Sequence, residues 1–136
     1  MTDIILSSGF LAFARHVGVL RAVERSSLSV DGVCGTSSGA LVGSLWAAGL
    51  DSFEIEQRVS AQTPLSMMRF HSRPWRGFFQ MSSVIAQLRE WLPPTFEELD
   101  RPFGVGVMNS EGKAQILSSG SLPEAVAASC SIPVVF

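Results

Sequence analysis

The sequence predicts an α/β protein in which a mainly parallel central sheet lies between two layers of helices, a three-layer sandwich. A short apolar run at residues 3–6 precedes a helical pattern over residues 14–25, and a second apolar run at residues 30–34 precedes an apolar helix. Strands joined through a helix run parallel in one sheet. A helix that is apolar on all sides indicates burial inside the fold, which a layered architecture provides.

The first half of the chain alternates strands and helices. The run at residues 3–6 ends in a Ser-Ser-Gly tripeptide, which is typical of a loop after a buried strand. Apolar residues recur every three positions over residues 14–25 and give that helix one apolar face. The apolar helix of residues 40–48 ends at Gly49.

The second half carries helix-start signals and a hairpin pattern. Asp51 and Glu54 form a capping-box pattern that starts a helix ending near Ala61. Ser82 or Ser83 starts another helix, which ends before a pair of prolines. The remaining expected elements are an irregular stretch between Pro64 and Pro74, a short helix at residues 95–98, a hairpin of strands 103–108 and 113–118, and a helix over residues 121–130.

Composition bounds the class of protein. Of the 136 residues, 46% are hydrophobic and 16% charged, and the formal net charge is −2. This apolar content excludes a disordered chain, and the charge argues against a nucleic-acid partner. No apolar run reaches the roughly 18 residues of a spanning helix, and the N-terminus lacks a secretory signal. We therefore expect a cytoplasmic protein with no cofactor and no metal, in which Cys34 and Cys130 are reduced, buried thiols.

Length allows at most one domain. The sequence closes on the apolar residues Val134, Val135 and Phe136, which would be exposed at a free end. We therefore expect residues 1–136 to be a single, partial domain, the N-terminal part of a longer protein.

A glycine-flanked serine carries the clearest chemical signal. Residues 35–39 read Gly-Thr-Ser-Ser-Gly, a G-x-S-x-G pattern between a predicted strand and a predicted helix. Such a turn presents the hydroxyl of Ser37 as a nucleophile, while Gly35 and Gly39 allow the sharp bend. The backbone N–H of Ser38, at the helix N-terminus, is the expected oxyanion donor. The alternative is a Gly/Ser turn that joins a strand to a helix without chemistry.

A base for this serine is not evident. Asp51, His71 and Asp100 are the candidates that follow Ser37, but Asp51 fits a helix cap better, and none of them forms an Asp-then-His pair of plausible spacing. His16 precedes the serine and fits a packed or capping residue better than a catalyst.

Four blocks of the sequence resemble, in order, the N-terminal part of patatin-like phospholipases. The second block, Gly-Thr-Ser-Ser-Gly-Ala-Leu, is similar to the family's G-T-S-A-G-A-L, and the last matches A-x-x-A-S-x-x-I-P-x-x-F. The blocks are residues 6–10 with 16–22, residues 35–41, residues 95–99 with the strand that follows, and residues 125–136.

The resemblance implies a serine acyl hydrolase of lipid esters with a Ser-Asp dyad. It implies that Gly9 and Phe10, at the family's glycine-rich oxyanion loop, donate backbone N–H groups. Ser8 and Phe10 replace two of the usual glycines there, and Ala12 replaces a basic residue. The family's aspartate lies in an Asp-Gly-Gly or Asp-Gly-Ala segment downstream. Asp31-Gly32 precedes the serine and cannot replace it, so we expect these residues alone to hydrolyse little.

A basic and aromatic stretch follows the capping-box helix. Residues 57–89 contain no acidic side chain and five arginines. This composition is typical of contact with a membrane surface, but a loop that covers the core with its arginines turned outward explains it slightly better. The candidate contacts are Arg69, Arg73, Trp75, Arg76, Phe78 and Phe79.

The sequence thus predicts a lipid acyl hydrolase that is cytoplasmic or peripheral to a membrane. The alternative is a truncated or non-catalytic relative that binds a lipid or a partner. The sequence leaves open the lipid and the oligomeric state.

Overall fold

The computed structural model describes residues 1–9, 12–61 and 81–131. Its sheet has the strand order β1-β2-β3-β4. β1 pairs with β2 and β2 with β3 in parallel, whereas β3 and β4 form an antiparallel hairpin. The sheet therefore confirms the predicted α/β class. The bounds are Asp3–Leu6 for β1, Gly32–Gly35 for β2, Phe103–Met108 for β3 and Ala114–Leu117 for β4.

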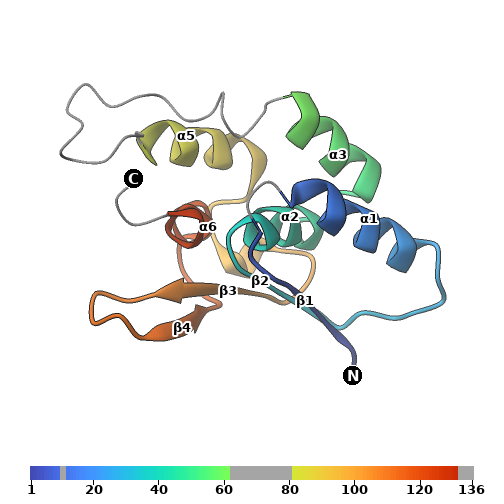
Figure 1. Ribbon diagram of the computed structural model, residues 1–136, viewed down its shortest axis with the longest axis horizontal. Helices are drawn as coiled ribbons and strands as arrows, with labels where there is room; N and C mark the ends of the chain where they lie inside the picture. The colour runs from blue at the N-terminus through green and yellow to red at the C-terminus, as the bar shows by residue number, and fades with distance from the viewer. Residues whose placement is uncertain (10–11, 62–80, 132–136) are drawn as a thin grey trace.

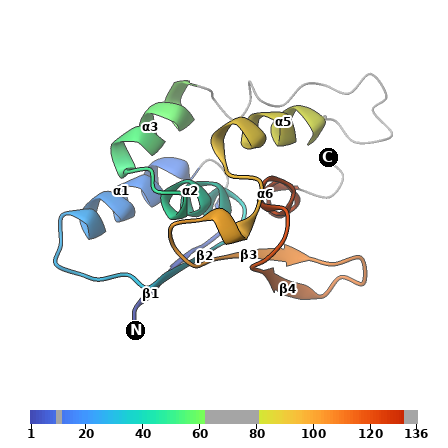
Figure 2. The same cartoon turned by 180° about the vertical axis from the view of Figure 1, so that it is seen from behind.

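The helices gather over one face of this sheet. Figures 1 and 2 show α2 directly above the strands, with α1 and α3 on one side of it and α6 and α5 on the other. The bounds are Phe13–Glu24 for α1, Ser38–Ala47 for α2, Ser52–Ala61 for α3, Met81–Trp91 for α5 and Leu122–Cys130 for α6, with a 3-10 helix, η2, at Phe96–Glu98.

The opposite face of the sheet is open in the described part of the chain. Ile5, Met108 and Ile116 are 77%, 71% and 66% exposed. The described residues thus supply two of the three layers that the sequence predicts, and the second layer of helices is not among them.

α2 is the centre of the core. Each of its residues is buried, because the helix lies between the sheet and α1, α3 and α6. Its far end is anchored by polar contacts that the sequence did not predict. The carboxylate of Glu24 accepts hydrogen bonds from the Trp46 indole N–H at 2.9 Å and from the Ser52 backbone N–H at 2.9 Å. The Arg101 guanidinium lies 4.4 Å from the centre of the Trp46 ring and donates to the Trp46 carbonyl.

Most predicted boundaries agree with the observed elements within about two residues. The predicted capping box is also present, since the Asp51 carboxylate accepts from the Glu54 N–H at 2.8 Å and the Glu54 carboxylate accepts from the Asp51 N–H at 3.0 Å. β2 begins at Gly32 rather than at Val30. The predicted irregular stretch between Pro64 and Pro74 lies outside the described residues.

Candidate active site

Ser37 occupies the sharp turn between β2 and α2. Its backbone has φ 53° and ψ −120°, and no other non-glycine residue in the described ranges has a positive φ. A side chain in such a conformation costs on the order of 1–3 kcal/mol and persists where surrounding structure enforces it. We call residues 35–39 the elbow. Its position after a strand and before a helix is the context that the G-x-S-x-G pattern requires.

Backbone packing explains why glycines flank this serine. A Cβ atom on Gly39 would lie 2.1 Å from the carbonyl oxygen of Leu6 in β1. A Cβ atom on Gly35 would lie 2.4 Å from the carbonyl oxygen of Gly39. β1, the elbow and the first turn of α2 therefore touch through their backbones, which leaves no room for a side chain at either glycine.

The backbone of Ser37 is held by the end of α6. The Ser37 N–H donates to Ser129 Oγ at 2.9 Å, and Ser129 Oγ donates to the Gly106 carbonyl at 2.6 Å. Cys130 Sγ donates to the Ser37 carbonyl at 3.4 Å. Sequence reasoning missed Ser129 as a site residue. The one feature of the sequence that pointed to Ser129 was its place in the Ala-Ser-Cys-Ser-Ile-Pro segment, which resembles the family pattern. That resemblance alone did not indicate what Ser129 does.

Ser38 connects the elbow to the predicted oxyanion loop. Its side chain is buried, and its hydroxyl donates to the Gly9 carbonyl at 2.8 Å. The same oxygen lies 3.3 Å from Nε2 of His16. The structure thus brings the Gly9 carbonyl next to the elbow. Phe10 lies outside the described residues.

His16 is a buried residue behind the elbow. Burial lowers the pKa of its imidazole below the usual value of 6.5, and a hydrogen bond with the Ser7 backbone opposes that shift in part. Among the described residues its imidazole bonds with Ser38 Oγ and with the Ser7 backbone, and not with Ser37. The packed role is therefore the one that the structure supports.

The aspartates that the sequence offers as a base lie away from Ser37. Asp51 is engaged in the helix cap described above. Asp100 donates its backbone N–H to the Ala47 carbonyl, at the opposite end of α2 from Ser37. Asp31 precedes β2 and accepts from the Thr2 N–H at the amino edge of the sheet. His71 lies outside the described residues.

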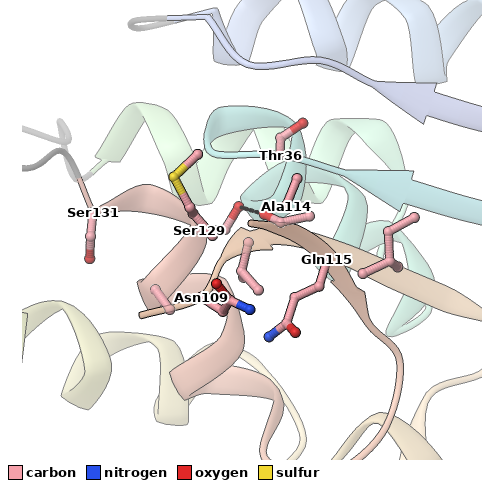
Figure 3. Close-up of a pocket in the computed structure, with 11 residues that line it drawn as sticks. Thr36, Asn109, Ala114, Gln115, Ser129 and Ser131 are labelled. Atoms are coloured by element: carbon pink, nitrogen blue, oxygen red, sulfur yellow. Dashed lines mark hydrogen bonds between the residues drawn. The ribbon is translucent and has the colours of Figure 1, made fainter. Parts of the chain in front are cut away.

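A cavity of about 810 Å³ adjoins the elbow. It lies at the carboxyl ends of β2 and β3, where ligands of parallel α/β sheets commonly bind. Thr36 and Ser129 border it on the elbow side, and Asn109 and Gln115 come from the β3–β4 hairpin (Figure 3). Ser37 itself is not among the described residues that line it. The apolar lining comprises Val107, Met108, Ala114, Ile116 and Ala128.

The described residues contain no group of three His, Cys, Asp or Glu side chains arranged to hold a metal ion. Cys34 and Cys130 form no disulfide, and each residue is partly buried. Within the described ranges, no helix has the length and apolar character needed to cross a bilayer. The arginine and aromatic residues expected at a membrane surface all fall in the part of the chain outside the described ranges.

Comparisons with known proteins place the chain in a family. The patatin-like phospholipase family matches residues 4–136. The chain is 29% identical over 133 residues to an uncharacterized NTE family protein of Mycobacterium tuberculosis, which covers 96% of this chain and 37% of the relative. It is 34% identical over 55 residues to the neuropathy target esterase of Drosophila melanogaster, which covers 40% of this chain and 4% of that protein.

The fold is also similar to a solved structure, ExoU of Pseudomonas aeruginosa in complex with SpcU. The TM-score is 0.64 at 14% identity, over 99% of this chain and 39% of that chain. The strand–elbow–helix arrangement therefore belongs to a patatin-like α/β fold. The chain is a member of the patatin-like phospholipase family. It spans 37% of the length of the mycobacterial relatives.

The backbone contact at Gly39 predicts a strong effect of a single methyl group. We expect Gly39→Ala to lower the free energy of unfolding by about 3 kcal/mol, the upper end of typical overpacking costs, because the new Cβ meets the backbone carbonyl of Leu6. Gly18→Ala is the matched control, since its Cβ meets nothing within 4 Å. There we expect a gain of about 0.5–1 kcal/mol from helix propensity. Urea denaturation measures both, and equal midpoints for the two variants would contradict the packing argument.

The buried His16 predicts a pH dependence of stability. Because its pKa is lowered in the folded state, the unfolded chain binds more protons below pH 6.5, and stability falls as the pH drops through that value. We expect the urea midpoint of the wild type to fall more between pH 7.5 and pH 5 than that of His16→Gln. Hydrogen bonds hold the pKa values of the Glu97 and Glu124 carboxylates below their usual value of 4.5, so these groups change the stability at lower pH than His16 does. Parallel pH profiles of the two proteins would refute this role of His16.

Proposed function

We propose that this protein is a serine acyl hydrolase of lipid esters and that Ser37 is its nucleophile. The observation that carries the proposal is the positive φ of Ser37, held between glycines at a strand-to-helix turn. Strain of this kind has a use where a hydroxyl must stand clear of the sheet. In the described residues, no hydrogen bond occupies the Ser37 hydroxyl, whereas those of Ser38 and Ser129 are both engaged.

In the proposed reaction, Ser37 Oγ attacks the ester carbonyl carbon and gives its proton to a carboxylate base. The carbonyl π electrons move to oxygen and form a tetrahedral oxyanion. When the oxyanion collapses, the bond to the alcohol oxygen breaks and the alcohol takes the proton from the base. Water then attacks the acyl-serine by the same steps, which releases the fatty acid and restores the hydroxyl.

We propose that the oxyanion is stabilised by the backbone N–H groups of Ser38, Gly9 and Phe10. Ser38 supports this role because it is the first residue of α2, where N–H groups have no carbonyl partner within the helix. Gly9 supports it because the Ser38 hydroxyl binds its carbonyl and holds the loop against the elbow. Losing one such donor costs about 3 kcal/mol in comparable sites.

The base in this proposal is an aspartate outside residues 1–136. Each aspartate near the sheet or the helices in the described ranges lies at a cap or at the far end of an element from Ser37. A Ser-Asp dyad with the aspartate in an Asp-Gly-Gly or Asp-Gly-Ala segment remains what the family resemblance implies. We therefore expect residues 1–136 on their own to hydrolyse esters poorly.

The cavity beside the elbow supports a lipid substrate. Its volume lies within the roughly 300–1,000 Å³ of small-molecule sites, and its apolar side chains suit a hydrocarbon chain.

Substitution of the nucleophile provides the test of this function. In the full-length protein, we expect a fluorophosphonate probe to label Ser37, as located by peptide mass spectrometry. Ser37→Ala should abolish this labelling and lower ester hydrolysis by at least about a thousandfold. Ser110→Ala, in the exposed β3–β4 turn, is the control that should behave as wild type. Equal labelling of wild type and Ser37→Ala would refute the proposal and favour a non-catalytic domain that binds lipid or a partner.

Contact with a membrane surface is a separate proposal, made for the arginine and aromatic residues of positions 69–79. Each arginine near an anionic surface contributes about 1 kcal/mol. Replacing Arg69, Arg73 and Arg76 by Gln should therefore weaken sedimentation with anionic vesicles by about a hundredfold, while binding to neutral vesicles stays low. Equal and negligible binding of the wild type to both kinds of vesicle would remove this proposal.

A further inference from the structure

The two peptide groups that flank Ser37 are each bound by a residue at the end of α6. Ser129 Oγ accepts the N–H of the Thr36–Ser37 peptide at 2.9 Å. Cys130 Sγ donates to the carbonyl of the Ser37–Ser38 peptide at 3.4 Å. Ser129 and Cys130 are neighbours in the chain, so one helix end contacts the strained residue on both sides.

We infer that Ser129 is a positioning residue for the nucleophile and that Cys130 assists it by orienting the oxyanion amide. This inference rests on the proposed function of Ser37. Neither residue touches the reacting atoms in this account. Each acts by fixing a peptide plane.

Ser129 is itself fixed, which a positioning residue requires. Its hydroxyl has a single proton, and it donates that proton to the Gly106 carbonyl at 2.6 Å. The oxygen lone pairs therefore face the Ser37 N–H. Gly106 lies in β3, whose pairing with β2 holds it beside the elbow. The elbow is thus tied through one hydroxyl to a central strand and to α6 at once.

Cys130 acts on the following peptide. The carbonyl that its thiol binds shares a plane with the Ser38 N–H, the proposed oxyanion donor. The Leu41 N–H binds the same carbonyl at 3.0 Å, as the first hydrogen bond of α2. Burial raises the pKa of the Cys130 thiol to about 12, so the thiol keeps its proton and remains a donor at neutral pH. A thiol is a weak donor, so its share is smaller than that of Ser129.

The consequence of losing Ser129 follows from the strain at Ser37. A positive φ at a serine persists where its surroundings enforce it. Without the hydroxyl, the Ser37 N–H loses its acceptor, and the peptide keeps only the hydrogen bond on its other side, where the Thr36 carbonyl accepts from the Gly39 N–H at 2.9 Å. The peptide plane is then less firmly held. A displacement of about 1 Å at a nucleophile costs about a hundredfold in rate.

The test measures labelling rate and hydrolysis in the full-length protein. We expect Ser129→Ala to slow fluorophosphonate labelling of Ser37 by about 10- to 100-fold and to lower kcat with little change in KM. Ser129→Thr keeps the hydroxyl and should restore most of the rate. Cys130→Ala should lower it only a few-fold. Ser44→Ala is the control, because that buried serine also donates to a backbone carbonyl, that of Leu41, without contacting Ser37.

Amide hydrogen exchange gives a second measurement that does not depend on activity. The Ser37 N–H should exchange faster in Ser129→Ala than in wild type, while α2 amides beyond the first turn keep their protection. If wild type is labelled at Ser37 and Ser129→Ala matches Ser44→Ala in rate and exchange, the positioning role is wrong and the proposed function stands. If wild type is not labelled at Ser37, both fall. Equal losses in Ser129→Ala and Ser129→Thr would likewise overturn the role of the hydroxyl.

Discussion

The structure depends on the contact between the backbone of Gly39 and the carbonyl of Leu6. Since a Cβ at Gly39 would come within 2.1 Å of that oxygen, α2 can approach β1 this closely only with glycine there. The approach sets where α2 begins, directly above the carboxyl ends of β1 and β2. The chain must then reverse within residues 35–39, and this tight reversal gives Ser37 its positive φ. The geometry of the candidate nucleophile is thus a consequence of sheet-to-helix packing.

The packing that creates this strain also has to hold it. Ser129, whose hydroxyl binds the Ser37 N–H, comes 92 positions later in the sequence. Gly9, which the Ser38 hydroxyl binds, comes 29 positions before it. The elbow therefore takes its final form only when β1, β3 and α6 have all assembled around α2. Local stability and the order of the site are coupled, so a substitution that loosens α6 against the sheet also changes the geometry at Ser37.

What the sequence could predict follows from the range of each interaction. β1 and β3 were predicted with their observed bounds, and the Asp51–Glu54 cap was predicted from four adjacent residues, because apolar runs and caps are local patterns. The glycine spacing around Ser37 was also local. Three long-range contacts were not predictable: the acceptor of the Ser37 N–H, the hydrogen bond from the Trp46 indole to Glu24, and the Ser38–His16 contact. They join residues far apart in the chain, and serine, glutamate and histidine have no periodicity that would indicate such partners.

The three serines of the site show how one side-chain type serves different ends through its surroundings. Ser38 is buried at the start of α2, and its hydroxyl donates to the Gly9 carbonyl. The Ser38 hydroxyl therefore has a structural role. The Ser129 hydroxyl bridges two backbone groups, the Ser37 N–H and the Gly106 carbonyl, and so also has a structural role. The hydroxyl of Ser37 is bound by no group among the described residues, although the backbone of Ser37 is held on both sides. A fixed backbone under an uncommitted hydroxyl is the arrangement that a nucleophile needs, because attack requires a defined position and a free lone pair. The same rigid backbone orients the Ser38 N–H, so one set of contacts holds both the proposed nucleophile and the proposed oxyanion donor.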